Sequence, residues 1–483
     1  MLAIRQGQRG IPAPTAILAA KVLFSAGTIA AYGFHRDELY LQQCGQHLAW
    51  GFVDHGPLVP ALSFLALHGF GASPVAARVF SAAASAATVW AAGRTAQALG
   101  GGLLAQSLAA VLVAIAPLFV YSGGVHGTNA FDQLFWTLAG LCAVHAARGE
   151  RRWIPWLGVW VGLGILAKPT MILGGVCVLA ALLASGTKAH LRGSGWWIAF
   201  AVAALLASPL ALWERANGWP GIAFLTTNRA SVLGEHGALS AFADQLRLLG
   251  PLSCAAAVAG VLAALRPGAD PRARTAALPF LFALVAVAAA GGKPYYASSA
   301  APLAIAAGAV ALADRVHAFP RSSFAVLAVA AVIQCAGALP LLPRFPLMLR
   351  LHPDLVQFAD WRGLVGRIAG LHEAAGLPRD APVLTDSYGT AAALERFGGP
   401  PALSGANAFG AWAWVARREP DAVLAIGYPP ALLRRFFGDV RPAGRLEAPG
   451  GGDNRFDFPR DAWLCAGRIA SLREGWSAFA HMD

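Results

Sequence analysis

The sequence predicts a mostly α-helical, polytopic membrane protein that ends in a small α/β domain. Of its 483 residues, 57% are hydrophobic and only 13% are charged, which is more apolar surface than a soluble core of this size can bury. Apolar runs recur throughout residues 1–345, whereas residues 346–483 contain more acids and shorter apolar runs. The bilayer must therefore solvate the first region, and the second is predicted to be a soluble domain.

About eleven membrane-spanning helices are expected, because a helix needs about 20 apolar residues to cross a bilayer. Lys168-Pro169 alone interrupts two of the apolar runs, and a proline there predicts a break between two helices. Two amphipathic segments are expected in the first outer loop. The apolar runs lie at 14–34, 75–97, 103–121, 129–147, 153–167, 169–185, 195–213, 250–265, 276–291, 299–314 and 323–342.

The distribution of arginine and lysine predicts the orientation of the chain, since cytoplasmic loops are enriched in these residues. With the amino terminus inside, the outer turns hold few of them, and an odd number of spans places residues 346–483 outside. The arginines are scattered between apolar segments, so the net charge of +12 does not indicate a nucleic-acid-binding face. The first apolar run lacks a small-residue cleavage site and is expected to remain as an anchor.

The six cysteines show no metal-ligand spacing. Cys44 and Cys465 lie in polar regions and could form a disulfide if they meet in the fold. The others lie in apolar segments and are expected to be small core residues; they are Cys142, Cys177, Cys254 and Cys335.

Short apolar runs at 382–385 and 422–427 predict two buried strands in the soluble domain. Each is followed by a helix-like stretch, at 390–397 and at 430–437. This alternation predicts a small α/β domain.

A polar island near the amino terminus supplies the first candidate site residues: Asp37, Glu38, Asp54 and His55. Ionisable groups at a membrane boundary are costly to dehydrate, so such a cluster indicates function. Structural alternatives remain open: Asp37 could pair with Arg36 or Lys293, Glu38 could position a helix or loop, and residues 54–57 could form a turn.

The predicted topology brings further polar residues to the same outer face: His126, Asn129, Asp132, Lys168, Lys293, Tyr295 and Tyr296. The chain has only four lysines, and two of them lie here, each followed by proline. A lysine suits a phosphate oxygen, and a carboxylate can take a proton from an attacking hydroxyl. Alternatively, Asp132 stabilises a helix start, His126 and Asn129 are solvated, and the tyrosines belong to an interfacial belt.

Four motifs carry a resemblance to a known family: RDELY at 36–40, WGFVDHGP at 50–57, NAFDQLFW at 129–136 and GKPYY at 292–296. Their order resembles the bacterial branch of the dolichyl-phosphate-mannose protein mannosyltransferases, which includes the aminoarabinose transferases that modify lipid A. The resemblance extends through NGWP at 217–220 to SYGTAAAL at 387–394 and covers most of the chain.

This resemblance implies a GT-C glycosyltransferase in which Asp37 is the catalytic aspartate of an Asp-Glu pair. Asp54 resembles the family's second acid, and Lys168 and Lys293 fall where cations could hold a lipid phosphate. Three positions depart from the usual pattern: Gly56, where Asp-His-Pro-Pro is frequent, Ala167, where Asn commonly precedes the lysine, and Ala406, where the family's tail usually has Ser-Gly-His-Asn.

We therefore expect a glycosyltransferase of the bacterial inner membrane that moves a sugar from a polyprenyl-phosphate donor to a lipid, glycan or protein acceptor outside the cytoplasm. Asp37 would be the base of an inverting displacement. No cofactor is required, and a divalent metal bridging carboxylate and phosphate is compatible with this chemistry. The alternatives are a transporter or lipid flippase, which the lack of internal repeats disfavours, and a structural assembly factor.

Overall fold

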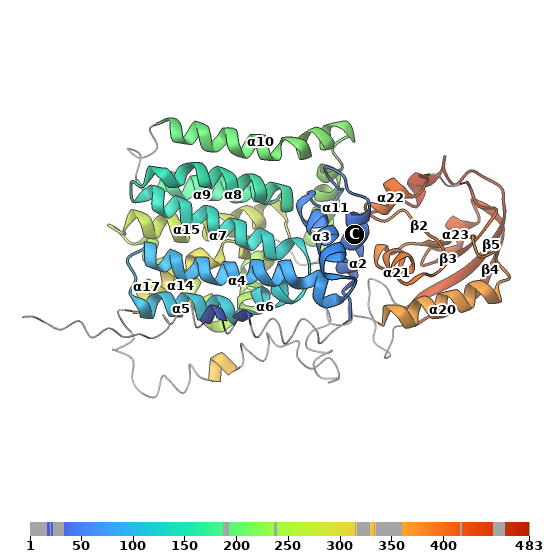
Figure 1. Ribbon diagram of the computed structural model, residues 1–483, viewed down its shortest axis with the longest axis horizontal. Coiled ribbons are helices and arrows are strands. Elements are labelled where there is room, and N and C mark those ends of the chain that lie inside the picture. The colour runs from blue at the N-terminus through green and yellow to red at the C-terminus, as the bar shows by residue number, and fades with distance from the viewer. Residues whose placement is uncertain are drawn as a thin grey trace, which may run out of the picture.

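A bundle of long helices and a smaller α/β domain make up the computed structural model, with the α/β domain at one end of the bundle (Figure 1). The structure describes residues 33–186, 193–235, 239–313, 360–415, 418–447 and 459–482, with short pieces at 17–19, 21–22, 315, 329–332 and 334. The bundle helices are α4 (Pro74–Ala98), α5 (Leu103–Ala114), α6 (Pro117–Gly124), α7 (Thr128–Ala147), α8 (Ile154–Ala167), α9 (Met171–Ala184), α10 (Ser194–Ala216), α14 (Pro251–Leu265), α15 (Pro271–Ala290) and α17 (Ala301–Ala313).

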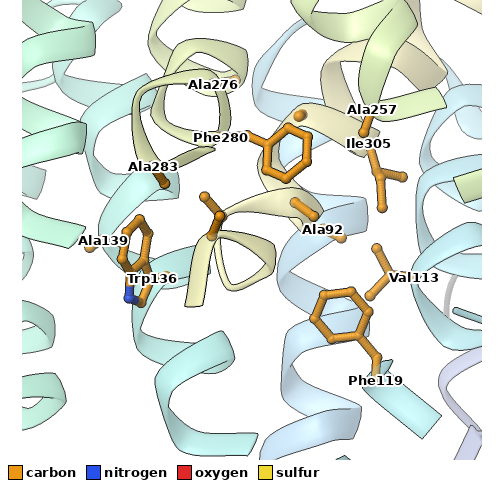
Figure 2. Close-up of a cluster of buried hydrophobic side chains, with 14 of the residues drawn as sticks. Ala92, Val113, Phe119, Trp136, Ala139, Ala257, Ala276, Phe280, Ala283 and Ile305 are labelled. Atoms are coloured by element: carbon orange, nitrogen blue, oxygen red, sulfur yellow. The ribbon is translucent and has the colours of Figure 1, made fainter. Parts of the chain in front are cut away.

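Small residues let the bundle helices approach closely. A Cβ atom added at Gly260 in α14 would collide with the backbone oxygen of Ala304 in α17, and one at Gly308 would collide with that of Ala256. Larger side chains, among them Trp136 and Phe280, fill the space between alanines at the centre of the bundle (Figure 2). Helices in a bilayer associate mainly through such close packing.

Three described helices, α4, α10 and α15, are long and apolar enough to cross a membrane, or up to four spans if the bent pair α5–α6 counts as one. This pair bends by 62° where Pro117 begins α6, so the predicted run 103–121 is two helices. Lys168-Pro169 does separate α8 from α9. The runs predicted at 14–34 and 323–342 lie largely outside the described residues, and the number of spans stays a prediction.

Two helices, α2 (Arg36–Gln46) and α3 (Leu58–Phe70), occupy the predicted first outer loop. The imidazole of His35 accepts the N–H of Asp37, and the Glu38 carboxylate accepts the N–H of His35. This reciprocal cap fixes the start of α2. The remaining described helices before the α/β domain connect the bundle helices: η1 (Arg151–Trp153), α11 (Pro220–Glu235), α12 (Ser240–Ala243), α13 (Gln245–Leu249) and α16 (Tyr295–Ser298).

The α/β domain contains one five-stranded sheet in the order β2-β1-β3-β5-β4. β1 is parallel to β2 and β3, while β5 is antiparallel to β3 and β4. The predicted strands are present, but the helix expected at 430–437 ends at Leu433, and β4 begins at Phe437. The elements are α20 (Trp361–Ala374), β1 (Val383–Thr385), α21 (Tyr388–Phe397), β2 (Ala402–Ser404), α22 (Phe409–Trp412), β3 (Ala422–Ile426), α23 (Pro430–Leu433), β4 (Phe437–Leu446), β5 (Arg460–Arg468) and η5 (Trp476–Ala478).

Cys44 and Cys465 are both free thiols buried in separate apolar clusters. The disulfide that the sequence left open is therefore not formed. Cys142 and Cys177 are buried as expected, and Cys254 is partly buried.

Candidate active site

A polar cavity of about 170 Å³ lies where the first outer loop, the bundle and the α/β domain meet. Eight predicted site residues line it: Asp37, Asp54, His55, Asn129, Lys168, Lys293, Tyr295 and Tyr296. The sequence separates these residues by up to 259 positions, so the fold brings them together from five segments. We call this space the polar cavity.

Asp37 lies in the first turn of α2, with its carboxyl group 48% exposed to the polar cavity. The hydroxyl of Tyr388 donates a 2.7 Å hydrogen bond to Oδ1, and the guanidinium Nε of Arg36 lies 3.9 Å away. Loss of water alone would raise the pKa of Asp37, but His35, Arg36, the Tyr388 hydroxyl and Lys293 outweigh it and hold this pKa below its usual value. The carboxyl group is therefore ionised at neutral pH.

Glu38 points away from the polar cavity and is fully buried. Its two oxygens accept hydrogen bonds from Arg78 at 2.6 and 2.7 Å and from the backbone N–H groups of His35 and His126 at 2.8 Å each. Glu38 thus joins α2, α4 and the segment before α7. This is the positioning role that the sequence left open for Glu38.

His126 and Asp132 are buried as well, and neither lines the polar cavity. The imidazole of His126 lies between the hydroxyls of Ser63 and Ser81, at 2.9 and 3.0 Å. Asp132 accepts the hydroxyl of Ser299 at 2.6 Å. Both residues support the cavity wall from behind.

Asp54 and His55 form another part of the cavity wall. The hydroxyl of Tyr40 donates to Asp54 Oδ1 at 2.9 Å, and the Nε2 atom of His55 lies 3.6 Å from the same oxygen. At Gly56 a Cβ atom would collide with the backbone oxygen of Leu166, so a residue with a side chain would push this wall away from α8.

Lys168 lies at the junction of α8 and α9, where its ammonium group donates a 2.7 Å hydrogen bond to Asn129 Oδ1. The same group lies 4.8 and 4.6 Å from the ring centres of Tyr295 and Tyr296, a geometry that favours a cation. Burial lowers the pKa of Lys168 to about 8; Asp132 opposes this shift and Lys293 adds to it. Lys168 is therefore a cation that an incoming anion would stabilise further.

A second, larger cavity of about 850 Å³ adjoins the polar cavity. Most of its wall is apolar and comes from α8, α9, α10, α11 and α15. We call it the apolar groove. The residues that line both spaces are Asp54, His55, Lys168, Phe224, Lys293 and Tyr296.

Several cavity residues were missed by the sequence-based prediction. Tyr388 and Asn407 come from the α/β domain, and Tyr40, Tyr121 and Phe224 come from the bundle side. A signal existed for two of them: Tyr40 and Tyr388 belong to motifs that carried the family resemblance. Asn407 also has a positive φ of 45°, which is uncommon for a residue with a side chain.

Carboxylates in the polar cavity could also serve as ligands of a divalent metal. The polar cavity has two of them, Asp37 and Asp54, and in the described parts of the chain no three His, Cys, Asp or Glu side chains gather as a metal site. The optional divalent metal therefore stays a prediction.

Comparison with known proteins places the fold. Residues 54–213 match the sequence pattern of the dolichyl-phosphate-mannose-protein mannosyltransferases. The structure is similar to ArnT from Cupriavidus metallidurans in the apo state, with a TM-score of 0.61 and 14% identity over 93% of this chain and 97% of that one. The chain has a GT-C fold. The predicted fold class is thus confirmed, and the family match supports the predicted resemblance over residues 54–213.

Two further structures share this GT-C fold. ArnT from Cupriavidus metallidurans bound to undecaprenyl phosphate matches with a TM-score of 0.63 and 13% identity, over 93% of this chain and 97% of that one. The oligosaccharyltransferase AglB from Archaeoglobus fulgidus, in complex with an inhibitory peptide and a dolichol-phosphate, matches with a TM-score of 0.51 and 14% identity, over 80% and 64% of the two chains. No curated protein matches by sequence.

Within the GT-C fold of this chain, the family match covers only part of the polar cavity. It begins at Asp54 and includes Asn129 and Lys168, but Asp37 and Lys293 lie outside the matched residues. The roles of these two residues therefore depend on the geometry of the cavity.

Proposed function

We propose that this protein is a membrane glycosyltransferase that transfers a sugar from a polyprenyl-phosphate donor to an acceptor outside the cytoplasm, with inversion and with Asp37 as base. The GT-C fold and the match to the mannosyltransferase family support a lipid-linked sugar donor. We further propose a location in the bacterial inner membrane, with the amino terminus in the cytoplasm and the α/β domain outside.

One observation carries the proposal: the apolar groove and the polar cavity meet at Lys168 and Lys293. A polyprenyl chain in the groove would bring its phosphate to this junction, where lysine ammonium groups can bind phosphate oxygens. ArnT has been solved with undecaprenyl phosphate, and AglB with a dolichol-phosphate, which supports a donor of this kind.

The position of Asp37 supports an attack on the sugar from the side opposite the donor phosphate. Asp37 lines the polar cavity but not the apolar groove, so it lies beyond the lysines as seen from the lipid. A donor would thus be ordered with its chain in the groove, its phosphate at the lysines and its sugar in the polar cavity. The acceptor would then approach the sugar from the side away from the phosphate.

In the proposed reaction, an acceptor hydroxyl oxygen attacks the anomeric carbon and forms the new glycosidic bond. The bond between the anomeric carbon and the phosphate oxygen breaks, and its electron pair leaves with the polyprenyl phosphate. Lys168 and Lys293 stabilise the phosphate charge. The carboxylate of Asp37 takes the proton of the hydroxyl, and one displacement inverts the anomeric centre.

Asp37→Asn tests this mechanism, because it keeps the shape of the side chain and removes the base. The purified protein would receive undecaprenyl phosphate bearing one of a panel of radiolabelled hexoses and pentoses, together with an envelope extract from a deletion strain. We expect transfer to fall by at least roughly a hundredfold, with an unchanged elution profile in detergent. Asp421→Asn is the matched control, since Asp421 is 90% exposed in the α/β domain.

Unchanged transfer by Asp37→Asn would refute Asp37 as the base. Donor movement across proteoliposomes without any sugar transfer would favour the transporter or flippase alternative.

A further inference from the structure

The α/β domain reaches directly into the polar cavity. Tyr388 is the first residue of α21, and its hydroxyl donates the 2.7 Å hydrogen bond to Asp37, 351 residues away in sequence. Hydrogen bonds to a carboxylate are roughly twice as strong as those between neutral groups. The base of the proposed reaction thus has a partner from another domain.

The ring of Tyr388 is held independently of its hydroxyl. The guanidinium of Arg36 lies 4.1 Å from the ring centre, and the ring of Tyr40 lies 4.9 Å away at 46°. These contacts keep the ring in place when the hydroxyl is removed, so the hydrogen bond can be tested separately.

A second hydrogen-bonded path links the α/β domain to the other cavity carboxylate. The backbone N–H of Ala408 donates to the Tyr40 hydroxyl at 3.2 Å, and this hydroxyl donates to Asp54. Both carboxylates of the polar cavity therefore receive a tyrosine hydroxyl whose position depends on the α/β domain.

One hydrophobic cluster is shared by the first outer loop and the α/β domain, so the two parts are not merely tethered. α21 packs against α2, and the indole N–H of Trp361 donates to the backbone oxygen of Phe34 at 2.9 Å. The shared cluster includes Leu39, Tyr40 and Phe52 from the loop and Leu364, Leu394 and Phe409 from the domain. Burial of this cluster fixes α21 relative to Asp37.

We propose that the α/β domain is an integral part of the catalytic centre and that Tyr388 is a positioning residue for Asp37. This inference rests on the proposed function. Tyr388 orients the carboxylate toward the acceptor side of the polar cavity and stabilises its ionised form, and the docked domain sets the position of Tyr388.

The charged and titratable groups that face Asp37 come from three segments. They are His35 and Arg36 at the start of α2, Tyr388 from α21, and Lys293 and Tyr295 from the segment between α15 and α17. Tyr388→Phe removes one hydrogen bond to the ionised carboxylate and leaves the other groups in place, so the pKa of Asp37 must rise.

Tyr388→Phe should lower kcat by up to roughly a hundredfold, because a carboxylate that has lost its orienting contact is misplaced relative to the acceptor. The donor KM should change less than twofold, because the apolar groove and both lysines are untouched. The acidic limb of the pH profile should move roughly one unit toward higher pH. The assay is release of polyprenyl phosphate from the donor identified with the wild-type protein, measured across the acidic and neutral pH range.

Tyr428→Phe is the matched control. The hydroxyl of Tyr428 is buried within the same domain and donates to the backbone oxygens of Thr385 and Phe479 at 3.3 and 3.4 Å, and it does not line the polar cavity. This variant should lower the thermal stability of the domain and leave the acidic limb unmoved.

An unmoved acidic limb in Tyr388→Phe, or a loss of activity that only follows the loss of folded protein as in Tyr428→Phe, would overturn the inference. The proposed function would survive that result as long as Asp37→Asn remains inactive. Full activity of Asp37→Asn would instead overturn the role of Asp37 as base, and absence of sugar transfer by the wild-type protein would overturn the proposed function itself.

Discussion

The buried pair of Glu38 and Arg78 gives the sharpest prediction about stability. Both side chains are fully buried, and the guanidinium donates to both carboxylate oxygens. Removing one partner of such a pair costs about 3–5 kcal/mol, because the remaining charge is buried without compensation. Glu38 also accepts two backbone N–H groups, at His35 and His126, so Glu38→Gln should cost at least this much.

A double-mutant cycle separates the pair from its surroundings. Glu38→Gln and Arg78→Met should each strongly lower the free energy of unfolding. The loss in the double variant should be smaller than the sum of the two single losses, by about 2 kcal/mol or more. The measurement is denaturant-induced unfolding in detergent micelles, followed by tryptophan fluorescence. Arg272→Met is the control, since the Arg272–Asp270 pair is partly exposed and should contribute about 1 kcal/mol or less. Additive effects of the two substitutions would refute the reasoning.

Two further predictions concern the donor. The pKa of Lys168 without donor is about 8, and a bound phosphate must raise this pKa, so the donor KM should be constant below pH 8 and rise up to tenfold per pH unit above it. Lys168→Arg should remove this rise. A wild-type donor KM that stays flat from pH 7 to 9.5 would contradict the role of Lys168. Ala207→Trp should fill part of the apolar groove, which Ala207 lines, and exclude at least two methylenes of the lipid, raising the KM of a long-chain donor roughly tenfold. The KM of a short-chain donor should not change in Ala207→Trp. The control Leu212→Trp changes a residue of α10 that does not line the groove and should leave the KM of both donors unchanged. Equal effects of Ala207→Trp on both donors would refute the apolar groove as the lipid site.

Local sequence features predicted many of the residues that line the polar cavity from the bundle side, but not Tyr40, Tyr121 or Phe224. Lys168 and Lys293 stood out because the chain has so few lysines, and the structure places both with Asp37 and Asp54 around the polar cavity. Residues that line the polar cavity and residues buried behind its wall differ only in the direction of their side chains, which the sequence does not give. Asp37 and Glu38 are adjacent in one helix turn, yet one faces the cavity and the other Arg78, a choice set by tertiary packing.

The α/β domain was predicted less completely, because strands β4 and β5 carry polar side chains. β4 contains Arg441 and Arg445 and is mostly exposed, so it lacks the apolar run by which β3 was found. The contact of Tyr388 with Asp37 joins positions 351 residues apart. No local pattern encodes such a contact, which depends on how the domain docks on the first outer loop.

The charges in the polar cavity favour a particular order of the catalytic steps. A carboxylate whose pKa is held below its usual value is a weak base, and a weak base removes a proton efficiently only when that proton has become acidic. In the proposed reaction, the acceptor hydroxyl becomes acidic as its oxygen bonds to the anomeric carbon, which requires that the bond to phosphate has already lengthened. The lysines at the junction stabilise the charge that this lengthening creates. Leaving-group stabilisation by Lys168 and Lys293 should thus precede proton transfer to Asp37, and the hydrogen bond from Tyr388 keeps the carboxylate ionised and aimed until that moment.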